Sequence, residues 1–550
     1  MSIRAVELPD ILRGMAGLVG LLLWLGIGCA RSERQVDSGI REGILYINNG
    51  AEVPDLDPHT VTGMPEFRIM DAIFEGLVEQ NPDTREILPA LAKKWEVSED
   101  QQTYTFHLRA GLTWSDGVPL TASDFVRSYE RTLHPELVAD YAYLFEIIEG
   151  AAAYRQGGES DFAKVGVKAL DERTLEIRLE HPVPYFLTLM TYPCWRPLPM
   201  HLVEEHDGLR RRGARWTREG NLVSSGPFVM TRWEPNRVLM VEKNQRYWDA
   251  ETVALNAIHF LPVESLDTEE RMFRSGQLHI TNVVPNSKIQ GYREMADTPL
   301  RIDPQLGTYF YRFNVTRPPF DDARVRRAFS LAIDREIIVE RITRAGQSPA
   351  GSFAPPGAGG FEPASTVALD LEEARRLMAE AGFPEGKGFP DVEILYNTSE
   401  SHRTIAEALQ QMWNTGLGVS LSLYNQEWKV FLDSLDTLDF SMARSGWVAV
   451  YDDPNQFLEI FTSGNPNNHT GWASPEYDRL HAASMAEGDP IRRMQLLQQL
   501  DSMLTEQAIV APIYHYTNFY LIDPRVRGWN PGPLDKRRYK YVYFDEPGEG

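Results

Sequence analysis

Apolar and polar residues alternate strictly along several short segments of the chain. The clearest are residues 103–108 (TYTFHL) and residues 174–179 (TLEIRL). A period of two places every second side chain on the same face of a strand, so that one face is buried and the other meets water. Both segments are therefore predicted to be half-buried antiparallel strands.

Other segments show the spacing of helices. Thr121 and Asp124 resemble a capping pair at the start of residues 122–133, and residues 371–381 place apolar side chains at helical intervals after Asp370. Capping side chains accept hydrogen bonds from the first backbone N–H groups of a helix. The sequence predicts a helix at each of these two places.

Residues 392–424 combine the two patterns. Residues 392–396 favour a strand, residues 401–413 have helical spacing and are followed by Gly416, and residues 419–423 alternate again. A strand–helix–strand unit of this length predicts two parallel strands joined by a crossover helix.

One stretch, residues 348–365, is rich in Pro, Gly and Ala, and we expect it to form a long surface loop. The chain has 550 residues, which is too long for one ordinary domain, so two or three are expected. The mixture of elements indicates an α/β protein, in which ligands bind at strand ends and between domains.

Residues 1–28 carry the features of a secretory signal. Arg4 and Arg13 precede an apolar run at 15–27, and Cys29 comes shortly after it. The run is shorter than the roughly 20 residues that a bilayer-spanning helix needs. A basic start, a short apolar run and small residues at its end are typical of an export signal.

Cys29 resembles the acylated cysteine of a bacterial lipobox, although Gly26 stands where such motifs usually carry leucine. The alternatives are a plain signal peptide that is cut nearby and an uncleaved anchor. Residues 29–43 are polar and are expected to tether a lipid anchor to the folded protein. We thus expect a lipoprotein of the periplasm or cell envelope.

Acidic residues outnumber basic ones by 78 to 55, which gives a net charge of −23. Such a surface repels nucleic acid and anionic lipid, so we expect neither as a partner. It suits cationic or zwitterionic ligands better than anionic ones. The two cysteines, Cys29 and Cys194, form no CxxC motif of the kind found in zinc or redox sites.

Sequence signatures of catalysis are absent. The chain has no G-x-S-x-G, H-E-x-x-H, Walker A or complete G-x-G-x-x-G motif, and its 12 histidines lack metal-ligand spacing. We therefore expect a binding protein without cofactor or metal, and not an enzyme. An exported hydrolase is the alternative from another functional class.

Nine short motifs occur along the chain: LDPH (56–59), FEGL (74–77), TFHLR (105–109), WSDG (114–117), DFV (124–126), PVPYF (182–186), PPFDD (318–322), LYNTS (395–399) and NQEWK (425–429). In this order and at these separations, they resemble the motifs of the oligopeptide-binding proteins that serve ABC importers, family 5 of the solute-binding proteins. The resemblance covers nearly the whole chain after the signal.

The resemblance implies an α/β, three-domain, two-lobed periplasmic binding protein (type II, cluster C) with a hinge between the lobes. The implied divisions are domain I (44–75, 200–306 and 518–545), domain II (76–199) and domain III (307–517). Crossings near Gly307 and Thr517 would let domains I and III close on an extended peptide. We expect a monomer that binds short peptides and docks on the permease subunits of an ABC importer.

The resemblance also assigns ligand-binding positions. Arg444 matches the arginine that faces peptide C-termini, and His402 matches a histidine that reaches the C-termini of longer peptides. Their alternatives are an internal salt bridge for Arg444 and a surface or capping position for His402. The remaining matches are pocket-lining positions: Asn397, Trp428, Gly446, Trp447, Tyr141 and Tyr516. For the two tryptophans, the alternative is a position in the hydrophobic core.

The chain departs from the family at the amino-terminal end of the site. Val450 replaces the aspartate that binds the peptide ammonium, and Thr62, close to Met64 in the site, replaces an acidic residue. A buried ammonium without a counter-charge is unfavourable. Either Asp452 or Asp453 substitutes, or the ligand is a modified or cell-wall-derived peptide without a standard free amine.

Overall fold

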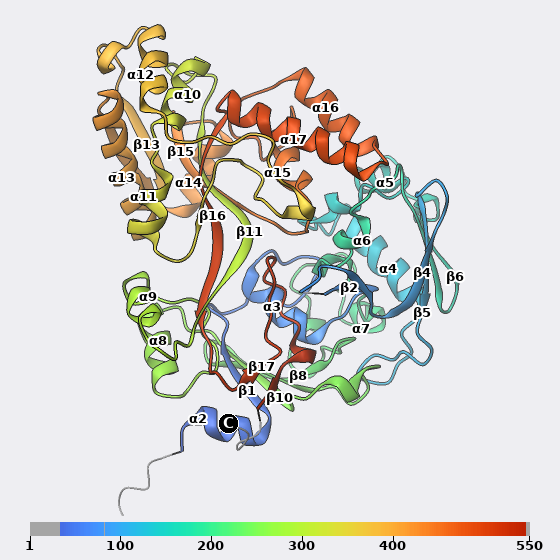
Figure 1. The fold of residues 1–550 in the computed structure, drawn as a ribbon. Coiled ribbons are helices and arrows are strands. Elements are labelled where there is room, and N and C mark those ends of the chain that lie inside the picture. Colours follow the sequence, from blue (N-terminus) through green and yellow to red (C-terminus); the bar gives the residue numbers. More distant parts are fainter. Residues whose placement is uncertain (1–32, 82, 546–550) are drawn as a thin grey trace, which may run out of the picture.

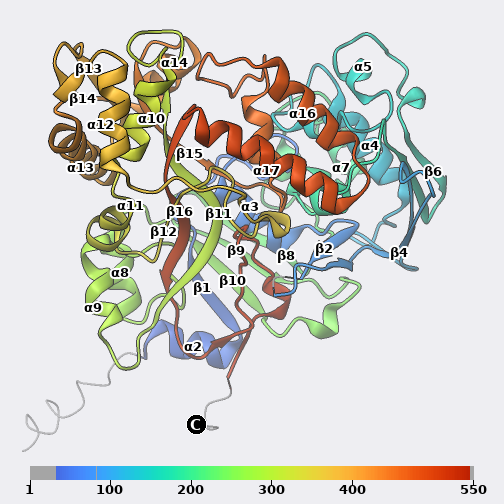
Figure 2. The ribbon, with the colours of Figure 1, turned by 45° about the horizontal axis from the view of Figure 1, so that its top comes forward.

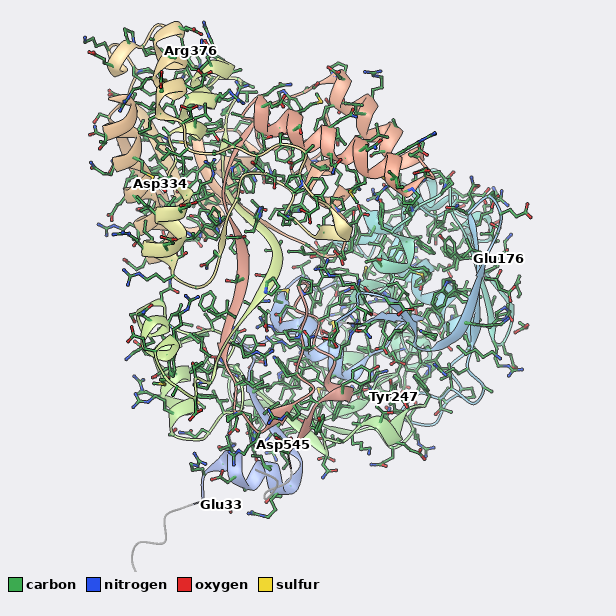
Figure 3. The ribbon with its side chains drawn as sticks, in the orientation of Figure 1. Glu33, Glu176, Tyr247, Asp334, Arg376 and Asp545 are labelled. Atoms are coloured by element: carbon green, nitrogen blue, oxygen red, sulfur yellow. The ribbon has the colours of Figure 1, made fainter. Side chains whose placement is uncertain are left out.

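The computed structural model describes residues 33–81 and 83–545, and its elements gather around three larger sheets (Figure 1). We call residues 307–517 the upper lobe and the other described residues the lower lobe. Glu33 and Asp545, the two ends of the described chain, lie together at the base of the lower lobe, far from the upper lobe (Figure 3).

The first sheet of the lower lobe has the order β1-β10-β9-β8, with β1 parallel to β10 and the other pairs antiparallel. Its strands are β1 (Ile44–Asn48), β10 (Ala257–Leu261), β9 (Val238–Lys243) and β8 (Phe228–Glu234). The helices of the lower lobe include α2 (Gln35–Glu42), α3 (Met64–Ile73), α7 (Met200–Glu205), α8 (Leu266–Arg274) and α9 (Asn286–Arg293).

The second sheet is antiparallel throughout. Its order is β4 (Ala92–Val97), β5 (Thr103–Leu108), β7 (Thr174–Arg178) and β6 (Val167–Asp171). Side chains of β5 alternate between buried and half-buried, and Phe106 pairs with Leu175 of β7, so the two predicted strands are confirmed. Helix α4 (Ala122–Leu133) is also confirmed, and Asp124 Oδ2 accepts a hydrogen bond from the Thr121 N–H at 2.8 Å.

The upper lobe is built on a six-stranded sheet. Its order is β12 (Ser348–Pro349), β16 (Val510–Leu521), β11 (Leu300–Phe313), β15 (Met442–Val448), β13 (Val392–Asn397) and β14 (Leu421–Gln426). Strands β13 and β14 are parallel and are joined through α13 (Glu400–Leu417), which confirms the predicted strand–helix–strand unit. The other helices include α10 (Ala323–Leu331), α12 (Leu371–Glu380), α14 (Trp428–Asp436), α15 (Asn455–Leu458), α16 (Pro475–Ala486) and α17 (Pro490–Glu506).

The predicted end of α13 was wrong. The helix continues through Gly416 to Leu417 and ends at Gly418, whose φ of 74° is a left-handed conformation that glycine adopts without strain. Gly416 is inside the helix for a packing reason, because a Cβ atom there would lie 3.0 Å from Leu371. The following strand accordingly begins at Leu421, later than predicted.

The expectation of a surface loop at 348–365 was also wrong. Phe353, Ala354 and Phe361 are 0% exposed and belong to a core cluster of the upper lobe. Asp501 Oδ1 accepts hydrogen bonds from the N–H groups of Phe353 and Ala354, which satisfies part of this buried backbone. Proline and glycine restrict or permit the backbone conformations of the segment, while its aromatic side chains pack into the core and hold the segment there.

Part of the expected tether is folded. Residues 35–42 form α2, in which Val36 is buried and Asp37 pairs with Arg525 at 2.8 Å. Gly39 lies so close to Tyr46 that a Cβ atom would meet its ring at 2.7 Å. The polar composition of this segment describes the exposed face of a helix that packs on the lower lobe. Cys29 and the signal segment lie outside the described residues.

Strands β11 and β16 pass from one lobe to the other (Figures 1 and 2). Their antiparallel register shifts between Pro304 and Thr308. The two expected crossings, Gly307 and Thr517, lie at this irregularity. The division into three domains with these bounds remains a prediction.

Candidate functional site

Arg444 of β15 is held by uncharged groups. Its guanidinium donates to Asn397 Oδ1 at 3.3 Å and to Tyr516 Oη at 3.2 Å, and it stacks over the ring of Tyr309 at 4.6 Å. Its Nε is buried without a hydrogen-bond partner, and no carboxylate of the described residues lies within 4 Å of its guanidinium. The internal salt bridge that was the alternative for Arg444 does not occur among these residues.

His402 lies in the first turn of α13, with Nδ1 3.3 Å from Tyr309 Oη. Burial, and next the charge of Arg444, lower the pKa of His402 to about 3. The imidazole is therefore neutral at physiological pH, and it is joined to the Arg444 cluster through Tyr309. Ser399, and not His402, occupies the capping position of α13.

Gly446 and Trp447 continue β15 beyond Arg444. A Cβ atom at position 446 would lie 2.6 Å from Tyr516 Oη, so glycine lets this phenol reach Arg444. Trp447 is half-buried on the opposite face of the sheet, and its Nε1 is buried without a partner. Trp428 begins α14, but its side chain lies outside the described part of the structure.

Three of the remaining predicted positions, Tyr141, Thr62 and Met64, belong to the lower lobe. Tyr141 packs edge-on against Tyr192, with ring centroids 5.1 Å apart. Thr62 is exposed, and Met64 begins α3 with its side chain half-buried. Helix α3 lies on the side of the lower lobe that faces the upper lobe (Figure 1). These positions therefore lie on a different lobe from the cluster around Arg444.

Val450 makes apolar contacts. The side chain packs against the main hydrophobic cluster of the lower lobe, and the N–H donates to Gln456 Oε1 at 2.7 Å. Asp453 is engaged by Arg493 through two hydrogen bonds of 2.8 and 2.9 Å. Asp452 accepts from the Gly359 N–H at 2.7 Å. Both possible substitutes for an ammonium anchor thus have partners within the protein.

The same loop joins the two lobes, a feature that the sequence did not indicate. Tyr451 is 2% exposed within the lower-lobe cluster, and its ring stacks on Tyr185 at 5.0 Å and 11°. Arg85 of the lower lobe lies 3.5 Å from Asp452 and donates to the carbonyl oxygen of Gly357. We call these contacts the seam. Tyr185 belongs to PVPYF, which was the one sequence motif that marked a residue of the seam.

Within residues 33–81 and 83–545, no helix has the length and apolarity that crossing a bilayer requires. No three His, Cys, Asp or Glu side chains in that part of the chain come together as a metal site would require.

A family model for the bacterial extracellular solute-binding proteins, family 5 (middle region), matches residues 86–469. This chain belongs to that family. The periplasmic oligopeptide-binding protein of Salmonella typhimurium is 36% identical to it over 96% of this chain and 97% of its own length. The periplasmic murein peptide-binding protein of Escherichia coli is also 36% identical, over 89% of this chain and 91% of its own.

Solved structures of family 5 proteins share the fold. The murein tripeptide-binding protein of Escherichia coli has a TM-score of 0.79 and 34% identity, covering 91% of this chain and 98% of its own. The Haemophilus influenzae oligopeptide-binding protein in complex with RPPGFSPFR has a TM-score of 0.76 and 32% identity, covering 92% and 99%. The predicted family and the two-lobed α/β fold are thereby confirmed.

Proposed function

We propose that this protein captures short peptides between its lobes, outside the cytoplasm, and delivers them to an ABC importer. The observation that carries the proposal is the cluster around Arg444. It offers a buried guanidinium with an unpartnered N–H and uncharged neighbours. A guanidinium binds a carboxylate bidentately, so the terminal carboxylate of a peptide supplies the missing counter-charge.

The other predicted positions receive roles within this proposal. His402 is a neutral hydrogen-bonding group for the C-terminal end of longer peptides, and Gly446 exposes backbone to an extended ligand. Lining residues on the upper lobe are Asn397, Trp428, Trp447, Tyr516 and Val450, and on the lower lobe Tyr141, Thr62 and Met64. Closure about the crossings near Gly307 and Thr517 brings the two sets together.

The amino-terminal end of the site supports a second candidate ligand. Val450 offers no acceptor side chain, while Asp452 and Asp453 bind groups of the protein. A free ammonium placed there would lose water without compensation. A peptide with a modified or blocked amine, including one derived from the cell wall, fits this end at least as well. The described residues offer nothing that favours an exported hydrolase.

The proposal includes a location. Relatives named as periplasmic proteins support an extracytoplasmic site of action. Acylation of Cys29 would anchor the chain to a membrane, and the described chain starts at the base of the lower lobe, away from the seam (Figure 3). An anchor at that end leaves the space between the lobes accessible. We propose that the anchored protein acts as a monomer.

Native mass spectrometry of the purified protein tests this function. We expect a mixture of short peptides to co-purify with it, and less of that mixture to co-purify with Arg444→Ala. Arg317→Ala removes an exposed upper-lobe arginine instead, so it should carry as much peptide as the wild type. A single non-peptide compound, or turnover of added peptides by the pure protein, would contradict the proposal.

A further inference from the structure

Arg312 on β11 differs from the other buried arginines. Arg312 is 5% exposed. Among the described residues its side chain makes one hydrogen bond, which Nη2 donates to Ser445 Oγ at 2.6 Å. Its Nε is buried and has no partner. Among the described residues, no carboxylate lies within 4 Å of this guanidinium, since no ion pair of Arg312 occurs there.

The comparison with the other buried arginines shows how unusual this is. Four of them pair with carboxylates: Arg131 with Asp57, Arg196 with Asp71, Arg493 with Asp453 and Arg537 with Asp535. Two others are surrounded by backbone carbonyls: Arg326 by those of Phe320, Gln507 and Ala508, and Arg335 by those of Ser330 and Pro512. Arg312 has neither kind of partner to offset the removal of its charge from water.

The second cation nearby increases the imbalance. Burial, and next the charge of Arg444, lower the pKa of Arg312 to about 9. Arg444 itself has only uncharged hydrogen-bond partners. Arg444 lies over the ring of Tyr309, and Arg312 lies over the ring of Phe310. Two buried guanidiniums on neighbouring strands, neither with a carboxylate of the described residues within 4 Å, leave positive charge that attracts an anion.

The sheet register places Arg312 on the strand next to the one that carries Arg444 and Gly446. Arg312 pairs with Ala443, and Thr308 pairs with Trp447, so these residues share one face of the sheet. Arg444 lies on the opposite face. Ser445, which accepts from Arg312, is the residue between Arg444 and Gly446. On the Arg312 face, the buried Nε1 of Trp447 is a further donor without an acceptor.

We propose that Arg312 forms a second anion-binding site, which receives the acidic side chain of a bound peptide while Arg444 holds the terminal carboxylate. This inference rests on the proposed peptide-binding function. A carboxylate accepts several hydrogen bonds, so one side chain satisfies the free donors on this face and balances the buried charge. The preferred ligands are then peptides that contain Asp or Glu.

The overall charge of −23 does not oppose this preference at short range. Charges on the protein surface are screened beyond about 8 Å at physiological ionic strength. The acidic surface slows the approach of an anionic peptide, whereas the local pair of guanidiniums determines how tightly it is held.

Calorimetric titration of matched peptides tests the site. The series consists of alanine tetrapeptides with a single Glu or a single Gln at each position in turn. For at least one position, we expect the wild type to bind the Glu peptide roughly tenfold or more tightly than the Gln peptide. Arg312→Gln should bring this ratio to about one and leave the affinity for the Gln peptide almost unchanged. Arg317→Gln, the matched loss of an exposed arginine, should keep the ratio.

A wild type that binds the series with no preference for Glu would overturn the inference and leave the proposed function standing. A preference that survives in Arg312→Gln would overturn it as well. Binding of none of the peptides would count against the proposed function and this site together. The wild-type comparison requires no variant, so it decides the matter even where Arg312→Gln fails to fold.

Thermal unfolding separates a binding role from a structural one. Arg312→Gln removes an unpaired buried charge, so the melting temperature of the protein without added peptide should stay the same or rise. Arg131→Gln breaks a buried ion pair and should lower it. A similar loss in both variants would make Arg312 a structural residue and contradict the proposed site.

Discussion

Tyr451 offers a sharp test of how the lobes are held together. Its ring is 2% exposed and stacks on Tyr185 across the seam at 5.0 Å. Burial of a side chain of this size contributes about 2–3 kcal/mol, and an aromatic pair adds about 0.5–1.5 kcal/mol. Tyr451→Ala should therefore destabilise the seam by about 2.5–4.5 kcal/mol.

The consequence for binding follows from the coupling between closure and ligand. Because 1.4 kcal/mol corresponds to a factor of ten, the population with the seam formed falls by roughly 60- to 1,600-fold relative to the population without it. A ligand that requires closure must overcome that difference, so peptide affinity should fall by up to this factor. Saturating peptide should still reduce the radius of gyration measured by small-angle X-ray scattering.

Two variants control for the loss of the ring. Tyr424→Ala makes the same truncation on β14, at a side chain that is 47% exposed and outside the seam, and should bind peptide as the wild type does. Tyr451→Phe keeps the stacked ring and should retain most of the affinity. Wild-type affinity in folded Tyr451→Ala would refute the reasoning, because the seam would then contribute nothing to closure.

Three further outcomes follow from the site and the N-terminus. Cys29→Ser should release the protein from membranes or block its processing, and a variant that is processed and fractionates like the wild type would contradict acylation. Titration calorimetry should show little preference for a free over an acetylated peptide amine, because Val450 offers no acceptor; a strong preference that Asp452→Asn or Asp453→Asn abolishes would establish a substitute anchor. Since the pKa of His402 is lowered to about 3, its ring gains no charge between pH 7.5 and 5.5, and peptide affinity should not rise on acidification through this group. A rise that His402→Asn removes would show that the ring titrates in this range.

Local features of the fold could be predicted from the sequence because short-range chemistry controls them. The strands at 103–108 and 174–179 have a period of two in the sequence. The Thr121/Asp124 pair predicted the start of a helix, and the helix begins there in the structure. The end of α13 could not be predicted in this way. Gly416 and Gly418 are equivalent as local signals, and only packing against Leu371 shows which one lies inside the helix.

The same distinction between local patterns and distant contacts applies to the site. Motifs pointed to Arg444 and His402, and the structure joins both to Tyr309. The partners of Arg85 and the missing partner of Arg312 depend on residues far away in the chain, so no local pattern reveals them. The overall acidity of the chain even suggested cationic ligands, whereas Arg444 and Arg312 are buried cations near the site.

The central claim is that Arg444 holds the terminal carboxylate of a bound peptide. It is tested most directly by titrating one peptide, with a free and with an amidated C-terminus, into the wild type and Arg444→Ala. In the wild type amidation should weaken binding by about 2–5 kcal/mol, the range for losing one partner of a buried charge pair. In Arg444→Ala, which already lacks the guanidinium, amidation should have much less effect. Equal amidation penalties in the two proteins would contradict the account and remove Arg444 from the peptide-binding site.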